Sequence, residues 1–412
     1  MPTRRLFLKR SALAMFGIGS TPVWLSRAVF AKNTDDRRKK VLIAIFQRGA
    51  VDGLNVVIPH ADRHYYAFRP TIAVPRPGRS PDSAIDLDGR FGLHPSLAAL
   101  KPLWDCGQLA IIEAVGSPDP TRSHFDAQDY MESGTPGRKG TRDGWLNRAL
   151  LPCEHPSPIR AVSLSPDLPR SLQGRQPALA VANINDFQVR SATAANPFEM
   201  MYGATADQAL KGTAHETFEA VKIIEGIQKT PYTPANGAVY PNGPLGRRLL
   251  EIARVIKADV GLEVAFTDVG GWDTHVNEVG AKPTIGQLPN LLREFGNALA
   301  AFTQDMGDRM ENVAIVTMSE FGRTAKENGD RGTDHGHANV MFVLGGGVRG
   351  GHIYGDWPGL APEQLYQGRD LNLTTDFRAV LSELVCRHLG NRELAAVFPG
   401  FEGSHFRGFL RA

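Results

Sequence analysis

The chain has 412 residues, 46 Lys+Arg against 43 Asp+Glu, and a formal net charge of +3 at pH 7. Hydrophobic residues make up 42% and charged residues 22%, which are ordinary globular values that exclude a disordered, collagen-like or coiled-coil chain. The 3 cysteines are too few for a disulfide framework or a cysteine-rich zinc site, so we expect free, buried thiols at Cys106, Cys153 and Cys386.

The first residues have the composition of an export signal. An Arg4-Arg5 pair is followed by an apolar stretch from Ala12 to Leu25, and Ala31 supplies a small residue for cleavage. A short anchor or a chance basic start is the alternative, but Gly and Pro break the apolar run too early for a membrane-spanning helix. The sequence therefore predicts a twin-arginine signal peptide over residues 1–31, recognition by the twin-arginine translocase, and a periplasmic or secreted product.

Removal of this segment changes the charge balance. Without residues 1–31 the chain keeps 41 basic and 43 acidic residues, a net charge of −2. The basic excess thus belongs to the signal, and nothing remains to suggest nucleic-acid binding. No later segment approaches the length of a transmembrane helix, so we expect a protein that is not transmembrane.

The remaining chain alternates apolar runs with helical periodicities. Strands followed by helices indicate an α/β fold, doubly wound, with a mostly parallel sheet flanked by helices. We expect residues 32–412 to form a single domain, with loop or small β insertions near 60–90 and 152–240. In chain order the predicted elements are strand Val41–Phe46, helix Pro95–Asp105, strand Leu109–Val115, helix Leu245–Lys257, strand Val264–Thr267, helix Leu288–Met306, strand Val313–Met318, strand Val340–Leu344 and helix Phe377–Leu389.

Polar residues adjoin all five predicted strands, after four of them and before the last. Ligands of parallel sheets bind beyond the carboxyl ends of the strands, so these residues predict a common site. Singly each has a structural alternative, such as a turn residue for Asp52, a helix N-cap for Ser123 or a solvated acid for Glu320. The four carboxylates and four imidazoles concerned are Asp52, His124, Asp273, His275, Glu320, Asp334, His335 and His337.

Such a set predicts bound metal. Acids and histidines gathered in one crevice repel each other or lose solvation unless a cation compensates them. Mixed Asp, Glu and His ligands suit zinc, manganese or iron, and magnesium or calcium where oxygen ligands dominate. We therefore expect a divalent metal site with one or two ions, all eight side chains being candidate ligands or their supports.

Five segments around these residues resemble the bacterial family called domain of unknown function 1501. The resemblance covers about residues 38–390 and includes the twin-arginine start, but the family carries no settled reaction. The family is itself similar to the alkaline phosphatase and sulfatase superfamily, whose members have a doubly wound core and bind one or two metals. The segments are Phe46–Asn55, Arg122–Gly134, Gly270–His275, Ser319–Thr324 and Asp334–His337.

The resemblance also implies roles for single residues. Asp52 matches the metal-binding Asp after the first strand, and Asp273 with His275 matches a metal-binding Asp and His at altered spacing. Ser123, which precedes a predicted helix, matches the nucleophile. Where the superfamily has an Asp-His pair, this chain has Glu320-Phe321, so one imidazole is missing and the metal count stays open; His335 or His337 is the candidate replacement.

The chemistry fits an exported, metal-dependent hydrolase of a phosphate or sulfate ester, with a small-molecule or polymer substrate. A serine at a helix N-terminus is activated by the helix dipole and by nearby metal, and Arg122, Arg142 or Arg323 is suited to holding ester oxygens bidentately. Surface salt bridges are the structural alternative for each arginine. The alternative function is a non-catalytic exported protein on the same fold that binds metal or a co-exported partner.

Overall fold

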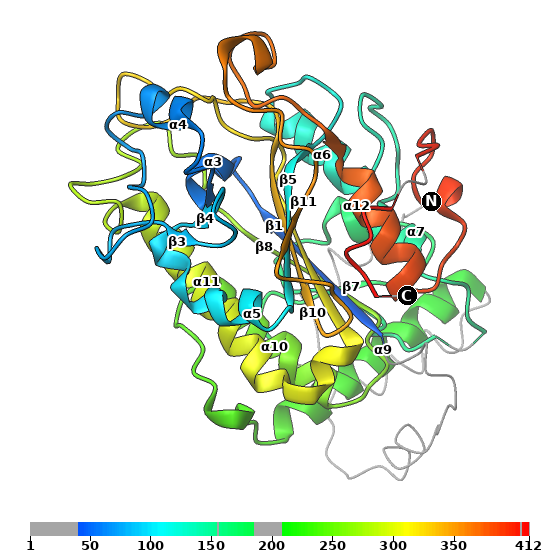
Figure 1. Ribbon diagram of the computed structural model, residues 1–412. Coiled ribbons are helices and arrows are strands. Elements are labelled where there is room, and N and C mark those ends of the chain that lie inside the picture. Colours follow the sequence, from blue (N-terminus) through cyan, green and yellow to red (C-terminus); the bar gives the residue numbers. More distant parts are fainter. Residues whose placement is uncertain (1–39, 155, 185–207, 404–405, 412) are drawn as a thin grey trace.

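The computed structural model describes residues 40–154, 156–184, 208–403 and 406–411 (Figure 1). The predicted signal peptide and residues 185–207 of the second predicted insertion lie outside the described residues. None of the described helices is long and apolar enough to cross a membrane.

A nine-stranded, mostly parallel sheet forms the centre of the described part of the chain. The strand order is β11-β5-β10-β9-β1-β8-β6-β7, and β12 pairs with β5. The strands are β1 Val41–Gln47, β5 Leu109–Gly116, β6 Ala161–Ser163, β7 Leu179–Ala180, β8 Val264–Val269, β9 Val313–Met318, β10 Asn339–Gly345, β11 His352–Tyr354 and β12 Thr375–Asp376.

Helices cover both faces of this sheet (Figure 1). Strand β1 is buried along its whole length, because its successive side chains enter two different hydrophobic cores. Ile43 packs with the core beneath helices α10 (Pro244–Lys257) and α11 (Gln287–Met306), whereas Leu42 packs with the core beneath α7 (Trp145–Ala149) and α12 (Phe377–Glu383). The predicted doubly wound α/β fold is therefore confirmed.

Strand β10 is the exception to the parallel arrangement. It pairs antiparallel with both of its neighbours, β5 and β9. Its first residue, Asn339, therefore lies at the sheet edge where the parallel strands end. The loop before β10 reaches that edge only because of this reversal, since a parallel strand would have placed residues 333–337 at the opposite edge.

Several predicted elements change type along their length. The helix predicted over Pro95–Asp105 is a 3-10 helix, Pro95–Leu100, continued by α5, Lys101–Asp105. The helix predicted over Phe377–Leu389 begins as α12, Phe377–Glu383, and ends in a π-helical turn, Leu384–His388. The other helices are α3 Gly53–Val56, α4 Arg63–Phe68, α6 His124–Ser133, α9 Gln208–Lys229 and α13 Leu394–Val397, with 3-10 turns at Arg170–Leu172, Ala235–Gly237, Gly307–Asn312 and Pro362–Gln364.

The first insertion contributes a small antiparallel sheet. Its strands are β2 (Val57–Ile58), β3 (Ile85–Asp86) and β4 (Gly92–Leu93), in the order β2-β4-β3.

The expectation of buried thiols is wrong: all three cysteines are free, but Cys106 is exposed and the other two are partly buried. Cys106 follows α5 at the surface, where the chain turns into β5.

The buried His94 makes the stability of the fold depend on pH. Its Nδ1 accepts a hydrogen bond from the Ser96 backbone N–H, and burial lowers the pKa of its ring to about 4. The folded state keeps the ring neutral while the unfolded state protonates near pH 6.5. We expect full stability above pH 6.5 and a loss of about 3 kcal/mol as pH falls to 4, from this residue alone.

Urea unfolding between pH 4 and pH 8 measures this slope, and His94→Asn is the matched variant. Asparagine keeps an acceptor for Ser96 but cannot take up a proton in this range. The variant should have a flatter dependence of unfolding free energy on pH. An unchanged slope would contradict the assignment to His94, whose pKa is further lowered by the charge of Arg293 and raised by that of Asp52.

Candidate metal centre

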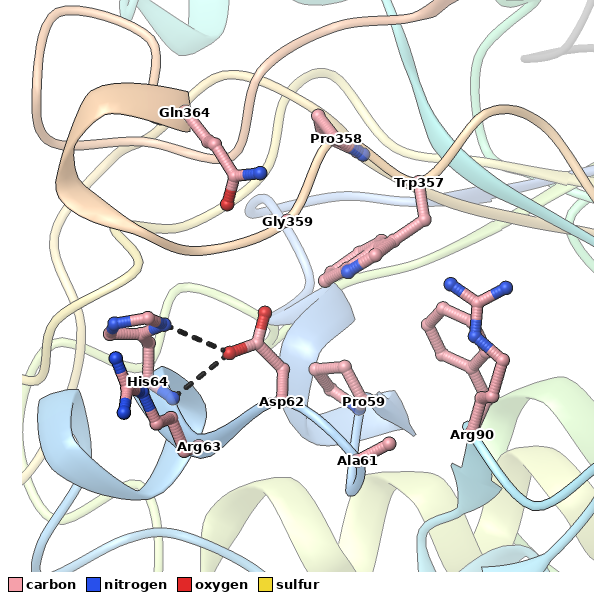
Figure 2. Close-up of a pocket in the computed structure, with 11 residues that line it drawn as sticks. Pro59, Ala61, Asp62, Arg63, His64, Arg90, Trp357, Pro358, Gly359 and Gln364 are labelled. Atoms are coloured by element: carbon pink, nitrogen blue, oxygen red, sulfur yellow. Dashed lines mark hydrogen bonds and ion pairs between the residues drawn. The ribbon is translucent and has the colours of Figure 1, made fainter.

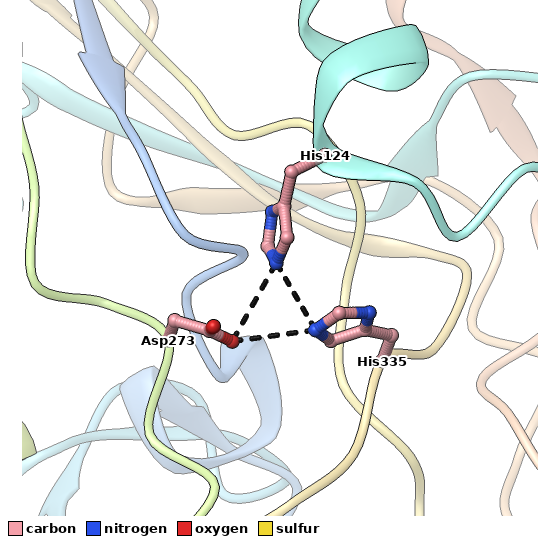
Figure 3. A group of neighbouring side chains, drawn as sticks. All are labelled: His124, Asp273 and His335. Carbon is pink, nitrogen blue, oxygen red and sulfur yellow. Dashed lines mark hydrogen bonds and ion pairs between the residues drawn. The ribbon is translucent and has the colours of Figure 1, made fainter.

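Three side chains from distant segments converge at the carboxyl edge of the sheet (Figure 3). His124 is the first residue of α6, Asp273 lies in the loop after β8, and His335 lies in the loop before β10. Each offers one ligand atom, and these atoms all lie within 4.8 Å of one another. Among the described residues this is the one group of acids, histidines and cysteines with such spacing.

The spacing of the three atoms matches one face of a tetrahedral metal site. The two Nε2 atoms of His124 and His335 are 3.0 Å apart. Asp273 Oδ1 lies 3.3 Å from His335 Nε2 and 3.6 Å from His124 Nε2. Ligands bound to zinc at about 2.0–2.1 Å lie about 3.3–3.4 Å from each other in tetrahedral geometry. The observed triangle is close to that size.

The hydrogen-bond partners of the two Nδ1 atoms orient both rings, so that each Nε2 faces the centre. His124 Nδ1 lies 2.8 Å from Glu320 Oε1, and His335 Nδ1 lies 3.0 Å from the carbonyl oxygen of Arg122. Both partners accept hydrogen bonds, so each Nδ1 carries a hydrogen, and a ring in its neutral form then directs the lone pair of Nε2 inward. Two lone pairs at this separation repel unless a positive charge lies between them. The residues present therefore fit a cation.

Glu320 supports His124 from behind and does not point into the centre. Although burial alone would raise its pKa, hydrogen bonds from His124 and Gln128 lower the pKa below the ordinary value. The resulting carboxylate also accepts the Gly49 backbone N–H at 2.8 Å. The hydrogen bond that His124 donates to the Glu320 carboxylate in turn raises the pKa of His124. A carboxylate behind a metal-binding histidine raises its basicity and orients the ring.

Asp273 is held by a buried arginine and by His275. Arg323 Nη2 donates to Asp273 Oδ1 at 2.5 Å, and His275 Nδ1 lies 3.0 Å from the same oxygen. Burial would raise the pKa of Asp273, but the Arg323 guanidinium lowers it below its usual value. Because His275 Nε2 faces a guanidinium nitrogen of Arg323 at 3.5 Å, its Nδ1 carries the hydrogen. His275 therefore positions Asp273.

Arg323 connects the loops that build the centre. Its guanidinium is buried, and besides Asp273 and His275 it donates to four backbone carbonyls. These bonds tie together the loops after β1 and β8 and the loop before β10, which explains how residues so far apart in sequence keep a common geometry. The carbonyls belong to Gly49, Ala50, Trp272 and Thr333.

Asp52, by contrast, forms an ion pair with another arginine. Arg69, at the end of α4, donates to both carboxylate oxygens of Asp52, at 2.5 and 2.9 Å. Both side chains are almost completely buried. The structure thus gives Asp52 a guanidinium partner and does not bring it into the His124–Asp273–His335 group.

The two remaining predicted ligands also lie apart from that group. Asp334 is exposed, and its Oδ1 accepts from the Asn328 amide at 3.2 Å. His337 is buried and stacks on Tyr366, with ring centroids 4.3 Å apart. Burial lowers the pKa of His337. Neither side chain belongs to the converging group among the described residues.

The three residues predicted to act on the substrate differ in their surroundings. Ser123 occupies the N-cap of α6, next to His124, yet its side chain makes no capping hydrogen bond. The Arg122 guanidinium pairs with the buried carboxylate of Asp370 at 2.5 Å, so its backbone carbonyl, not its side chain, serves His335. Arg142 is exposed, and within the described residues it makes no ion pair with the centre.

Sequence reasoning missed a second layer of supporting residues. Gln128 donates to Glu320 at 2.8 Å and accepts from Arg48 at 2.9 Å. One signal for it exists, because Gln128 lies four residues after His124 and so on the same face of α6. No comparable signal points to Asp370, which approaches Arg122 from a loop far along the chain.

Glu320→Gln tests the support behind His124. The amide keeps the size of the side chain but loses the negative charge that strengthens the ring as a ligand. We expect zinc or manganese to bind about 10–100-fold more weakly. Titration calorimetry on metal-depleted protein measures this, with Asp334→Asn as the matched control at an acid outside the centre. Equal affinity in wild type and Glu320→Gln would contradict the role given to Glu320.

Comparison with known proteins places the chain in context. The family model described as "Protein of unknown function (DUF1501)" matches residues 108–392. No curated protein matches the chain. The chain is similar in structure to the PsFucS1 sulfatase from Pseudoalteromonas sp., with 10% identity, a TM-score of 0.39 and coverage of 95% of this chain and 78% of that one. It is also similar to the lipoteichoic acid synthase LtaP from Listeria monocytogenes, with 11% identity, a TM-score of 0.31 and coverage of 78% and 70%.

Proposed function

The chain belongs to the DUF1501 family, and we propose that it is an exported, metal-dependent hydrolase of a phosphate or sulfate ester. The observation that carries this proposal is the convergence of two imidazole lone pairs and one carboxylate oxygen on a single point. The predicted twin-arginine signal assigns the activity to the periplasm or the exterior.

The proposed metal ligands are His124 Nε2, His335 Nε2 and Asp273 Oδ1. Three protein ligands leave a coordination position open, as catalytic zinc sites do, whereas structural zinc sites are closed by four. When bound, a divalent cation of this kind, such as zinc, manganese, iron, magnesium or calcium, acts as a Lewis acid toward an ester oxygen. Asp273 is 46% exposed, so a substrate has access to this side of the centre.

One ion fits better than two. The family resemblance places Phe321 where alkaline phosphatases have an imidazole, which leaves the metal count open at the level of sequence. The Phe321 ring lies 4.9 Å from the His124 ring and 5.0 Å from the His335 ring, measured between centroids. An apolar side chain thus packs against the centre, and Glu320 is engaged by His124. We propose a single-ion site.

Ser123 is the proposed nucleophile. Its hydroxyl is not used for capping, and it lies at the N-terminus of α6, where the helix dipole stabilises negative charge. Its oxygen would bond to phosphorus or sulfur while the bond to the alcohol oxygen breaks, and the hydroxyl proton would leave with the alcohol. Water would then release phosphate or sulfate and restore Ser123. The nearby guanidinium groups of Arg122 and Arg323 are engaged by carboxylates, so the proposal does not use them on the ester.

Ser123→Ala distinguishes this function from its alternative, a non-catalytic protein that binds metal or a partner on the same fold. We expect turnover of p-nitrophenyl phosphate or sulfate to fall about 10³-fold or more, because the nucleophile is lost. Elemental analysis should give unchanged metal content. Retained turnover would exclude Ser123 as the nucleophile, and a metal-loaded wild type without turnover on either ester class would favour the binding protein.

A further inference from the structure

A pocket of about 500 Å³ lies apart from the metal centre, between the start of α4, the end of the small sheet and the loop after β11 (Figure 2). None of its lining residues belongs to the metal centre or supports it. Its charged, aromatic and amide side chains include Asp62, Arg63, Arg90, Phe91, Trp357 and Gln364.

An aromatic ring occupies the middle of this pocket. Trp357 packs edge-to-face on Phe91, with centroids 5.1 Å apart and planes at 86°. In Figure 2 the Trp357 ring lies between Asp62 and Arg90. Trp357 is only partly buried, so its indole offers an apolar surface to a ligand.

The charged groups in the pocket that have no ion-pair partner among the described residues are two arginines. Asp62 Oδ1 accepts from the backbone and ring of His64, and its Oδ2 accepts from the Leu360 N–H at 3.0 Å. Arg63 and Arg90 are exposed, and in the part of the chain that the structure describes neither has a carboxylate within ion-pair distance. Arg90 lies over the Phe91 ring, with its guanidinium carbon 5.8 Å from the ring centroid. A pocket whose one acid is engaged, and whose two arginines have no carboxylate partner among the described residues, favours an anion.

The pocket is also formed in advance of any ligand. The bond from Leu360 to Asp62 joins the loop that carries Trp357 to the start of α4. Gln364 Oε1 accepts the Ala361 N–H at 2.9 Å and so holds the same loop in its turn. A ligand therefore orders little of the chain on binding, which lowers the entropic cost of association.

We propose that this pocket binds an acidic oligosaccharide. The C–H face of a pyranose ring packs on indole, and carboxylates on neighbouring sugars would pair with Arg63 and Arg90. In Figure 2 Arg90 is drawn beside the Trp357 ring, whereas Arg63 lies on the other side of the pocket, beyond Asp62. A neutral sugar would leave both guanidinium groups unpaired, and a small inorganic anion would leave the indole uncovered. This inference stands on the pocket alone and does not depend on the hydrolase.

The probe is trigalacturonate, titrated into the full exported chain and followed by calorimetry and tryptophan fluorescence. We expect saturable binding that maltotriose, a neutral sugar of the same length, does not reproduce. Arg63→Gln combined with Arg90→Gln should weaken binding about 10–100-fold, since two charge-assisted contacts are lost at exposed positions that do not hold the fold. Trp357→Ala should weaken it as well, and Arg392→Gln, at another exposed arginine, should have no effect.

Several results would overturn the proposal. Absence of saturable binding, equal binding of maltotriose, or equal loss in Arg392→Gln would each exclude a specific acidic-sugar site. Inorganic sulfate that binds as tightly as the trisaccharide, with no effect of Trp357→Ala, would show a simple anion site instead. Binding that disappears in Asp273→Ala would place the sugar at the metal centre and not in this pocket.

Discussion

We expect replacement of Asp273 with alanine to abolish metal binding and ester hydrolysis while the chain stays folded. Asp273 supplies the carboxylate oxygen closest to both imidazole nitrogens, so its loss leaves two neutral ligands for a divalent ion. We expect metal content to fall from about one equivalent to less than about one tenth, which at a fixed free-metal concentration corresponds to a loss of roughly 100-fold or more in affinity.

The fold should survive this change. Arg323 loses its carboxylate partner, but it keeps four backbone carbonyl acceptors, and Asp273 itself is nearly half exposed. Circular dichroism and thermal melting of metal-free samples check this, with Asp334→Ala as the control at an exposed acid in the neighbouring loop. Full metal content in Asp273→Ala, or loss of metal in Asp334→Ala, would show that the ion is bound elsewhere.

Replacing Asp52 with alanine should have the opposite result, a large loss of stability with metal binding retained in the folded fraction. Arg69 is completely buried and pairs with both oxygens of Asp52. The neighbouring Glu278 is also buried, and burial together with the Asp52 carboxylate raises its pKa well above the usual range. Removal of Asp52 leaves a buried cation unpaired, which costs about 3–5 kcal/mol.

A double-mutant cycle separates this pair from a general disturbance of the core. Arg69→Met removes the cation, and Asp52→Ala combined with Arg69→Met should lose clearly less stability than the sum of the two single changes. Urea unfolding gives the free energies, and elemental analysis of the folded protein gives the metal content. A stable Asp52→Ala protein that has lost its metal would restore Asp52 as the ligand that the family resemblance implies.

The sequence predicted the fold well because its strands are uninterrupted apolar runs. Val41–Phe46 and Val313–Met318 are bounded by polar loops, so their limits agree with β1 and β9 to within a residue. It could not predict the direction of β10, since an apolar strand is compatible with either orientation. That direction depends on pairing with β5 and β9, which no local pattern records.

Local sequence patterns could not predict which of the polar residues contact each other, for a similar reason. The sequence placed the candidates at one edge of the sheet, but partners such as Arg69 for Asp52 and Arg323 for Asp273 come from other loops. Residues 60–90 have no periodicity from which α4, and hence Arg69, could be located. A carboxylate that meets a guanidinium and one that meets two imidazoles look alike in sequence and are separated only by tertiary packing.

The position of β1 in the sheet has a consequence for how the protein is made. Leu42 pairs with Val264 and Val41 pairs with Val313, so the first strand to be synthesised waits for partners from the far half of the chain. At ribosomal rates of 5–20 residues per second, that wait is roughly 15–55 s. During this time a 7-residue apolar strand has both edges open. We therefore expect the nascent chain to need chaperone protection until Met318 has emerged, and a truncated product that ends before β9 to aggregate.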